Sequence, residues 1–266
     1  MLDDILATKR AELALFQQDE ALDTLRRAAA DAPPARDFAG ALRRADGRLA
    51  VVGELKRRSP SKGELAPDLD PGPAAKAYEA GGAAALSVLT DQVYFGGSAA
   101  DLQDARAATA LPVLRKDFTI DESQVFETRA IGADAVLLIL AALPDDGLVR
   151  ALLATATGIG LATLVEAHDD AELDRALALG AGIVGVNARD LGTFAEDLTV
   201  SERLAARIPA GVVGVAESAV RFVDDAHRMA AAGYDAVLVG EALVRSDDPG
   251  ALVAGMSALL VATRGD

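Results

Sequence analysis

Short apolar runs that end in polar residues recur along the chain. Such near-continuous runs are typical of strands in a parallel sheet that is covered on both faces. They occupy residues 49–56, 85–91, 111–118, 133–140, 161–167, 182–190, 211–218 and 235–243. The pattern therefore predicts eight strands.

The stretches between these runs are rich in alanine and have apolar residues every three or four positions, as in 169–181 and 221–235. Several of them end in glycine shortly before the next run, which is the usual stop signal of a helix. Eight strand–helix units predict an α/β fold, a (β/α)8 TIM barrel. An open sheet in which two runs are not strands is the alternative.

Residues 1–48 precede the first run and predict an N-terminal helical extension. Ile5, Leu6, Lys9, Leu13 and Phe16 follow helical spacing. Because this segment is too small to hold a core of its own, we expect it to pack on a barrel formed by 49–266, as a single domain overall.

The predicted strands end in residues that suit acid–base chemistry. In a TIM barrel the carboxyl ends of the strands carry the catalytic groups. Glu54 and Lys56 lie two residues apart, so they share a face of their strand. Several polar strand ends together form a constellation of the kind that an active site needs, although a ring of salt bridges at the barrel mouth is the alternative. The other polar ends carry Lys116, Glu166, Asn187, Arg189, Glu217, Ser218, Gly240 and Glu241.

Lysine is rare here, with five lysines among 26 basic residues. Arginine cannot release a proton in a protein, whereas lysine can act as an acid. We therefore expect Lys56 and Lys116, at strand ends, to serve chemistry. Lys9 and Lys76 are interpreted as plain surface or helix-stem lysines.

Composition excludes several classes of function. The formal net charge of −15 argues against binding of nucleic acid. The absence of cysteine excludes thiolate nucleophiles and cysteine metal ligands, and two histidines cannot form a three-histidine zinc site, so no metal is expected. The chain has no run of about 20 apolar residues and no basic leader, which indicates no membrane span and a cytoplasmic protein.

The last two strands and the first loop suggest how an anion is held. Small residues followed by a helix start often bind phosphate in barrels of this class. Ser218, Ala219, Gly240 and Glu241 occupy these positions. The loop after the first strand adds Ser59, Ser61 and Lys62 as groups that close over a ligand.

Ordered motifs over nearly the whole chain resemble the indole-3-glycerol-phosphate synthase family. They are GELKRRSPSKG (53–63), SVLTDQVYFGGS (87–98), PVLRKDFTIDESQVFETRAIGADAVLL (112–138), LVEAHDDAELDRALALGA (164–181), GVNARDLGTFAEDL (185–198), AESAVR (216–221) and DAVLVGEALVR (235–245). The resemblance implies a cofactor-free barrel enzyme of tryptophan biosynthesis. It implies ring closure, decarboxylation and dehydration of 1-(2-carboxyphenylamino)-1-deoxyribulose 5-phosphate, a phosphorylated small molecule, to indole-3-glycerol phosphate.

The resemblance also implies roles for individual residues. Lys116 matches the general acid that protonates the substrate carbonyl. Lys56, Glu54 and Glu166 match groups associated with the later proton transfers. The substrate-binding positions that it implies are Asn187, Arg189, Glu217, Ser218, Phe95, Phe118, Ser59 and Ser61, and the phosphate-binding positions are Ser218, Ala219, Gly240, Glu241 and Lys56.

The chemistry of the residues agrees with this resemblance. Addition to a carbonyl followed by dehydration needs acids and a base. Two lysines with nearby carboxylates supply both if burial and like charges hold one lysine pKa low. Positive charge for an anionic substrate is expected from Lys56, Arg57, Lys62, Lys116 and Arg189.

One position departs from the family pattern, because Ala219 stands where glycine is usual. Alanine disfavours positive φ, so we expect modestly weaker phosphate binding with function retained.

Two alternative functions are an isomerase of the same pathway and a barrel that binds a sugar phosphate without catalysis. Phosphoribosylanthranilate isomerase uses a cysteine, which this chain lacks. A non-catalytic sugar-phosphate binder would not need both lysines and both glutamates. No partner protein is expected, and a monomer is preferred over a homodimer.

Overall fold

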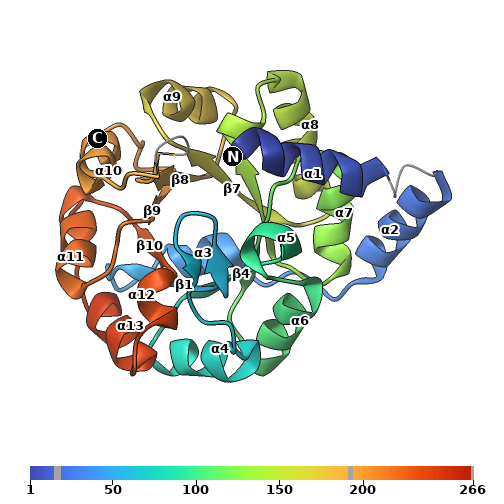
Figure 1. Cartoon of the computed structure of the whole chain (residues 1–266). Coiled ribbons are helices and arrows are strands. Elements are labelled where there is room, and N and C mark those ends of the chain that lie inside the picture. The colour runs from blue at the N-terminus through green and yellow to red at the C-terminus, as the bar shows by residue number, and fades with distance from the viewer. Residues whose placement is uncertain (15–18, 191–193, 265–266) are drawn as a thin grey trace.

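The computed structural model describes residues 1–14, 19–190 and 194–264, and a closed barrel of parallel strands forms its centre (Figure 1). The strands follow one another around the barrel in the order β1, β10, β9, β8, β7, β6, β5, β4. Each predicted run contains one strand, so the predicted TIM barrel is confirmed. The strands are β1 (Ala50–Leu55), β4 (Ala85–Leu89), β5 (Val113–Lys116), β6 (Ala135–Ile139), β7 (Ala162–Ala167), β8 (Ile183–Asn187), β9 (Val213–Glu217) and β10 (Ala236–Val239).

Helices ring the barrel, and an aspartate begins many of them. The side chains of Asp70, Asp145, Asp169, Asp197 and Asp248 each accept a hydrogen bond from an amide of the first turn. No helix within the described ranges is long and apolar enough to cross a membrane. The helices of the ring are α4 (Pro71–Ala80), α6 (Ala99–Ala108), α7 (Glu122–Ala130), α8 (Asp146–Gly158), α9 (Asp170–Ala178), α10 (Leu198–Ala205), α11 (Val223–Ala232) and α13 (Pro249–Ser257).

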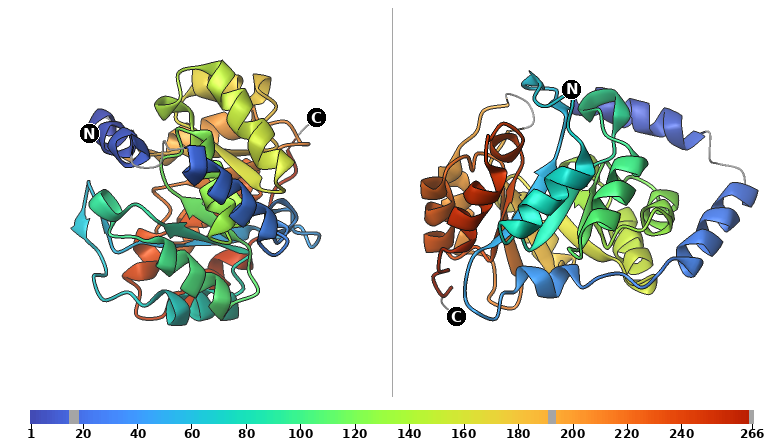
Figure 2. Two further views of the ribbon diagram at one scale, coloured as in Figure 1. Left: turned by 90° about the vertical axis from the view of Figure 1, so that its right-hand side faces the viewer. Right: turned by 90° about the horizontal axis from the view of Figure 1, so that it is seen from below.

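The N-terminal segment forms three helices that run from one end of the barrel to the other (Figure 2). Helix α1 (Leu2–Ala14) lies across the mouth formed by the carboxyl ends of the strands, and α2 (Asp19–Asp31) packs on α7. Helix α3 (Phe38–Leu42) packs against β1 and β4 at the opposite end. Phe16, which was predicted to continue the first helix, lies outside the described residues.

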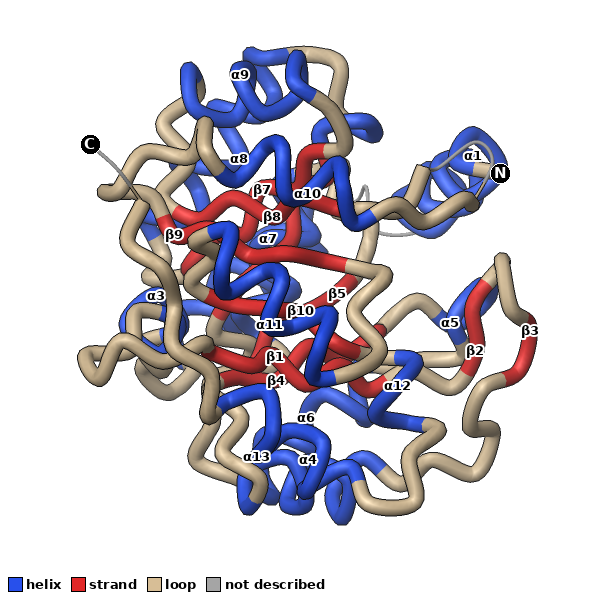
Figure 3. The backbone as a smooth tube through the Cα atoms, turned by 90° about the vertical axis from the view of Figure 1, so that its left-hand side faces the viewer, coloured by secondary structure: helices blue, strands red, loops and turns tan. Residues whose placement is uncertain are grey.

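Small elements gather around the mouth. The loop after β1 forms a hairpin of β2 (Arg58–Ser59) and β3 (Gly63–Glu64), and α5 (Gln92–Phe95) follows β4. Figure 3 shows this hairpin, α5 and α1 at one end of the barrel, with α3 at the other. The remaining short elements are η1 (Leu140–Ala142) after β6 and α12 (Glu241–Val244) after β10.

Alternation along the strands divides the buried side chains into two clusters. One set, which includes Val51 and Leu55 of β1, packs against the helices. The other set, which includes Ala50 and Val52, fills the barrel interior together with Leu42 of α3. Because side chains alternate, Glu54 is the next inward position of β1 after Val52. The interior therefore changes from apolar to charged as it approaches the mouth.

We propose that residues 1–48 and the barrel unfold as one unit, because Leu42 is fully buried at the bottom of the barrel. Leu42→Ala should lower the free energy of unfolding by about 2–5 kcal/mol, since it leaves a cavity. Leu260→Ala is the matched control, because Leu260 is 70% exposed and its truncation should change stability by no more than about 0.5 kcal/mol. Urea denaturation measures both, and equal effects of the two variants would contradict the proposed packing.

Candidate active site

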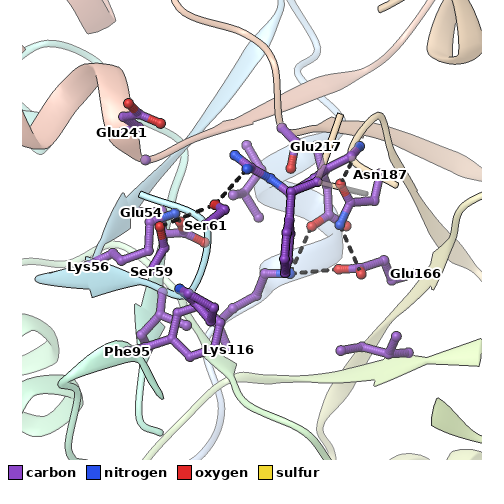
Figure 4. A pocket seen from close by; sticks show the side chains of 18 of the residues that line it. Glu54, Lys56, Ser59, Ser61, Phe95, Lys116, Glu166, Asn187, Glu217 and Glu241 are labelled. Atoms are coloured by element: carbon purple, nitrogen blue, oxygen red, sulfur yellow. Dashed lines mark hydrogen bonds and ion pairs between the residues drawn. The ribbon is translucent and has the colours of Figure 1, made fainter. Parts of the chain in front are cut away.

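A pocket opens at the mouth of the barrel, where side chains from several strand ends point toward one another (Figure 4). Met1, Leu2 and Ile5 of the N-terminal segment form part of its wall. Apart from Arg57 and Lys62, the site residues predicted from the sequence line it: Glu54, Lys56, Ser59, Ser61, Phe95, Lys116, Phe118, Glu166, Asn187, Arg189, Glu217, Ser218, Ala219, Gly240 and Glu241.

The period of the strands explains why these residues converge. Lys116 follows Leu114, Glu166 follows Leu164 and Glu217 follows Val215, each two positions along from a side chain of the interior cluster. Each charged residue is thus the last inward position of its strand. Closure of the barrel then brings side chains from β1, β5, β7, β8 and β9 to one place.

Two glycines make room for the carboxylates. A Cβ at Gly185 of β8 would collide with the carboxylate of Glu217, and a Cβ at Gly240 would collide with that of Glu54. The absence of a side chain at these positions lets the two glutamates lie against the barrel wall.

The centre of the pocket is the ammonium of Lys116. Its Nζ lies 2.6 Å from Oε2 of Glu166 and 3.0 Å from Oε2 of Glu217. Asn187 donates a hydrogen bond of 3.1 Å to the other oxygen of Glu166. Both glutamates are almost fully buried, so one cation faces two carboxylates in a place with little water.

Burial and nearby charges shift the pKa values of Glu166 and Glu217 in opposite directions. Burial raises the pKa of Glu217 to about 8, and repulsion by Glu166 adds to this rise, while Lys116 opposes it. Burial also opposes ionisation of Glu166, but attraction by Lys116 and hydrogen bonding to His168 hold the pKa of Glu166 well below its usual value. At neutral pH the pair therefore presents one acid and one base.

Lys116 is not the lysine whose pKa is held low. Burial lowers its pKa, but attraction by Glu166, Glu217 and Glu54 outweighs burial and raises the pKa above its usual value. The reason is that three carboxylates approach from three different strands, β1, β7 and β9. Lys116 is therefore a charged ammonium at neutral pH.

Lys56 forms the second lysine pair of the pocket, on β1. Its ammonium contacts the carboxylate of Glu54, as their shared strand face predicted. Glu54 is buried, and the side chain of Lys56 is 16% exposed.

Aromatic and polar groups line the rest of the pocket. The rings of Phe95 and Phe118 lie with centroids 6.4 Å apart and planes tilted by 36°. Nη1 of Arg189 donates a hydrogen bond of 2.8 Å to the Ser61 hydroxyl, which ties the hairpin loop to the opposite rim. Arg189 also pairs with Glu196.

Two of the cations expected at the ligand lie elsewhere. Arg57 is held by the carboxylate of Asp101, at 2.6 and 2.9 Å, and Lys62 is exposed. Among the described lining residues, Arg221 adds a positive charge that the sequence analysis did not name, and it pairs with Glu196.

The interpretation of Lys9 as a plain lysine is also wrong. Lys9 is 3% exposed, and its Nζ lies 2.8 Å from Asp91, 3.1 Å from Asp117 and 3.0 Å from Glu12. Asp91 also accepts hydrogen bonds from the amides of Tyr94 and Phe95. Lys9 thus joins α1 to the ends of β4 and β5. In the sequence, the feature that could have indicated a buried partner for a lysine is Asp117, which follows Lys116 at the end of a predicted strand.

The backbone after β9 is unusual. Ser218 and Ala219 have φ of 64° and 60°, in the left-handed region that glycine adopts most easily. Ala219 therefore adopts the positive φ that alanine disfavours. A non-glycine residue there carries strain of about 1–2 kcal/mol.

The comparisons with solved structures support the fold. A thiamine phosphate pyrophosphorylase from Pyrococcus furiosus is similar with a TM-score of 0.61 and 16% identity, covering 81% of this chain and 96% of that chain. An N-acetylmannosamine-6-phosphate 2-epimerase from Clostridium perfringens also gives 0.61 at 16% identity, over 79% of this chain and 92% of its own. At such low identity the likeness establishes the barrel alone.

Sequence comparison is more specific. Indole-3-glycerol phosphate synthase 2 of Streptomyces coelicolor is 55% identical over 228 residues, 86% of this chain and 87% of that protein. Indole-3-glycerol phosphate synthase of a Nocardioides species is 51% identical over 257 residues, 97% of this chain and 98% of its own. The model of the family described as indole-3-glycerol phosphate synthase matches residues 2–256. This chain therefore belongs to the indole-3-glycerol phosphate synthase family.

Proposed function

We propose that the pocket at the barrel mouth carries out the family's reaction with Lys116 as its first acid. The chain is a carboxy-lyase of tryptophan biosynthesis that converts 1-(2-carboxyphenylamino)-1-deoxyribulose 5-phosphate to indole-3-glycerol phosphate, carbon dioxide and water. The observation that carries the assignment of Lys116 is its ammonium, held by Glu166 and Glu217 and exposed to the pocket.

Ring closure is the first step. The aromatic carbon that bears the carboxylate attacks the ketone, and Lys116 donates a proton to the ketone oxygen. Its pKa is raised, so the ammonium is fully formed at neutral pH, and the developing alkoxide is a stronger base than the amine. Departure of carbon dioxide then restores the aromatic ring.

Dehydration follows. One proton leaves the carbon beside the nitrogen, and a second proton joins the hydroxyl, which departs as water. We assign the base to Glu166, because its pKa is held low and it is ionised. We assign the acid to Lys56, whose partner Glu54 holds the ammonium at the pocket wall.

The whole conversion consumes one proton. Two protons join the departing oxygen and one leaves carbon, while the carboxylate is lost as neutral carbon dioxide. Burial raises the pKa of Glu217, so this group takes up a proton more readily than an ordinary glutamate, and it lies 3.0 Å from Lys116 Nζ. We propose that Glu217 helps to reprotonate Lys116 after ring closure.

The two ends of the substrate fit different walls. Phe95 and Phe118 are assigned to the anthranilate ring, because they are the tilted aromatic pair beside Lys116. The phosphate is assigned to the ends of β9 and β10, with Lys56 as its assigned cation, just after β1, the strand next to β10. The assigned phosphate-binding residues are Ser218, Ala219, Gly240 and Glu241, and the assigned polar contacts of the sugar and ring are Ser59, Ser61, Asn187 and Arg189.

We further propose that the chain acts as a monomer in the cytoplasm. The four large apolar side chains that are exposed among the described residues, Met1, Val93, Phe222 and Leu260, lie in separate parts of the chain. The residues assigned to catalysis, Lys116, Glu166, Lys56 and Glu54, meet in one pocket within a single chain. Sedimentation of the purified protein measures its oligomeric state.

The first test separates the two lysines with substrate that carries a labelled carboxylate. Lys116→Ala should release neither carbon dioxide nor product, whereas Lys56→Ala should release carbon dioxide while indole fluorescence develops at least about 100-fold more slowly. The reason is that Lys116 acts before decarboxylation and Lys56 acts after it. Lys62→Ala is the matched control and should behave as the wild type, since Lys62 is exposed away from the pocket. Full activity of Lys116→Ala would overturn the assignment.

The second test concerns Ala219. Ala219→Gly should lower KM for the substrate about threefold, because glycine relieves part of the strain at positive φ and lets phosphate approach the backbone. Ala262→Gly, at an exposed position near the other end of the barrel, should leave KM unchanged. An unchanged or increased KM in Ala219→Gly would show that the methyl group does not hinder the phosphate.

A further inference from the structure

His168 lies directly behind the proposed base. It follows β7 and comes two residues after Glu166. Its Nε2 lies 3.3 Å from Oε1 of Glu166. That is the oxygen that also accepts from Asn187, whereas Lys116 binds the other oxygen. His168 is not among the described residues that line the pocket, so it reaches the chemistry through Glu166.

The other side of the imidazole is anchored by α9. Nδ1 lies 3.0 Å from Oε2 of Glu172, and the His168 backbone amide donates to the same oxygen at 2.8 Å. Glu172 lies in the first turn of α9, where its own amide donates to the capping Asp169. The ring is therefore held between a buried carboxylate and a partly exposed one.

These contacts make the ring a cation. Burial lowers the pKa of His168, but its hydrogen bonds to Glu166 and Glu172 outweigh burial and raise the pKa to about 10. At neutral pH both ring nitrogens then carry protons. Nδ1 donates to Glu172, and Nε2 faces Glu166 as an ion pair at 3.3 Å.

We propose that His168 is a positioning residue that orients Glu166 and keeps it ionised as the base of the reaction, with Glu172 as its anchor. The proposal rests on the proposed role of Glu166. The charged groups that face Glu166 are Lys116 from β5, Glu217 from β9 and His168 itself, and Glu172 from α9 faces the far side of the ring. His168 thus supplies a second positive charge to a carboxylate that already shares Lys116 with Glu217.

The positive charge of the His168 imidazolium determines the direction in which the pKa of Glu166 shifts. Glu166 works as a base only when it is ionised, and the imidazolium favours ionisation. Loss of the imidazolium raises the pKa of Glu166, so activity on the acidic side of the profile disappears at a higher pH. A residue with a merely structural role would lower stability or activity without moving this limb.

The test compares His168→Gln, which keeps a hydrogen-bond donor without the charge, with His168→Ala, which keeps neither. In His168→Gln the acidic limb of the pH profile of kcat should move to a higher pH by about one unit, and KM should change less than about twofold. His168→Ala should show the same shift and also a lower plateau, because the orientation of Glu166 is lost. Glu172→Gln should shift the limb in the same direction by a smaller amount.

The chain offers a matched control in its other histidine. His227 is exposed on α11 at the outer ring of helices. His227→Gln should leave kcat, KM and the pH profile unchanged. Thermal unfolding of each variant shows that the comparison concerns folded protein.

A second readout does not depend on catalysis. Carbon NMR of the labelled glutamate carboxyl groups, assigned with Glu166→Gln, reports the pKa of Glu166 in the free enzyme. A pKa that is the same in the wild type and His168→Gln would overturn the role of His168. A raised pKa with an unmoved kinetic limb would instead overturn the role of Glu166 as the base.

Discussion

The structure of the site depends on one buried cation shared by two carboxylates. Lys116 faces Glu166 and Glu217 in a place with little water. Burial of a charge is unfavourable unless it is paired, so the three groups hold one another in place. The same arrangement separates the pKa values of the two glutamates, which turns a structural contact into an acid and a base.

The barrel makes this arrangement by simple alternation. Every second side chain of a strand points into the barrel. Near α3 these side chains are apolar and fill the interior, and at the mouth they are charged. Lys9 then joins α1 to the ends of β4 and β5 through Asp91 and Asp117. The helix that covers the pocket is therefore fixed by buried ion pairs next to Lys116.

Much of this was predictable from the sequence, because the strand period and the polar strand ends are local features. The eight strands and all the expected lining residues follow from them. Contacts between distant strands do not follow, since a local pattern shows which face a side chain occupies and not which partner it meets. For this reason Arg57 was expected at the substrate although it binds Asp101. For the same reason Lys9 was interpreted as a plain lysine although it pairs with Asp91, and the sequence did not show that several acidic side chains raise the pKa of Lys116.

The most direct test of the central claim is the turnover of Lys116→Arg. Arginine keeps the positive charge and can hydrogen-bond to both carboxylates, but it cannot give up a proton. If Lys116 is a proton donor, the variant should stay folded and bind the substrate while kcat falls about 10²- to 10⁴-fold. Turnover near the wild-type rate would contradict the account, because it would show that the pocket needs only the charge.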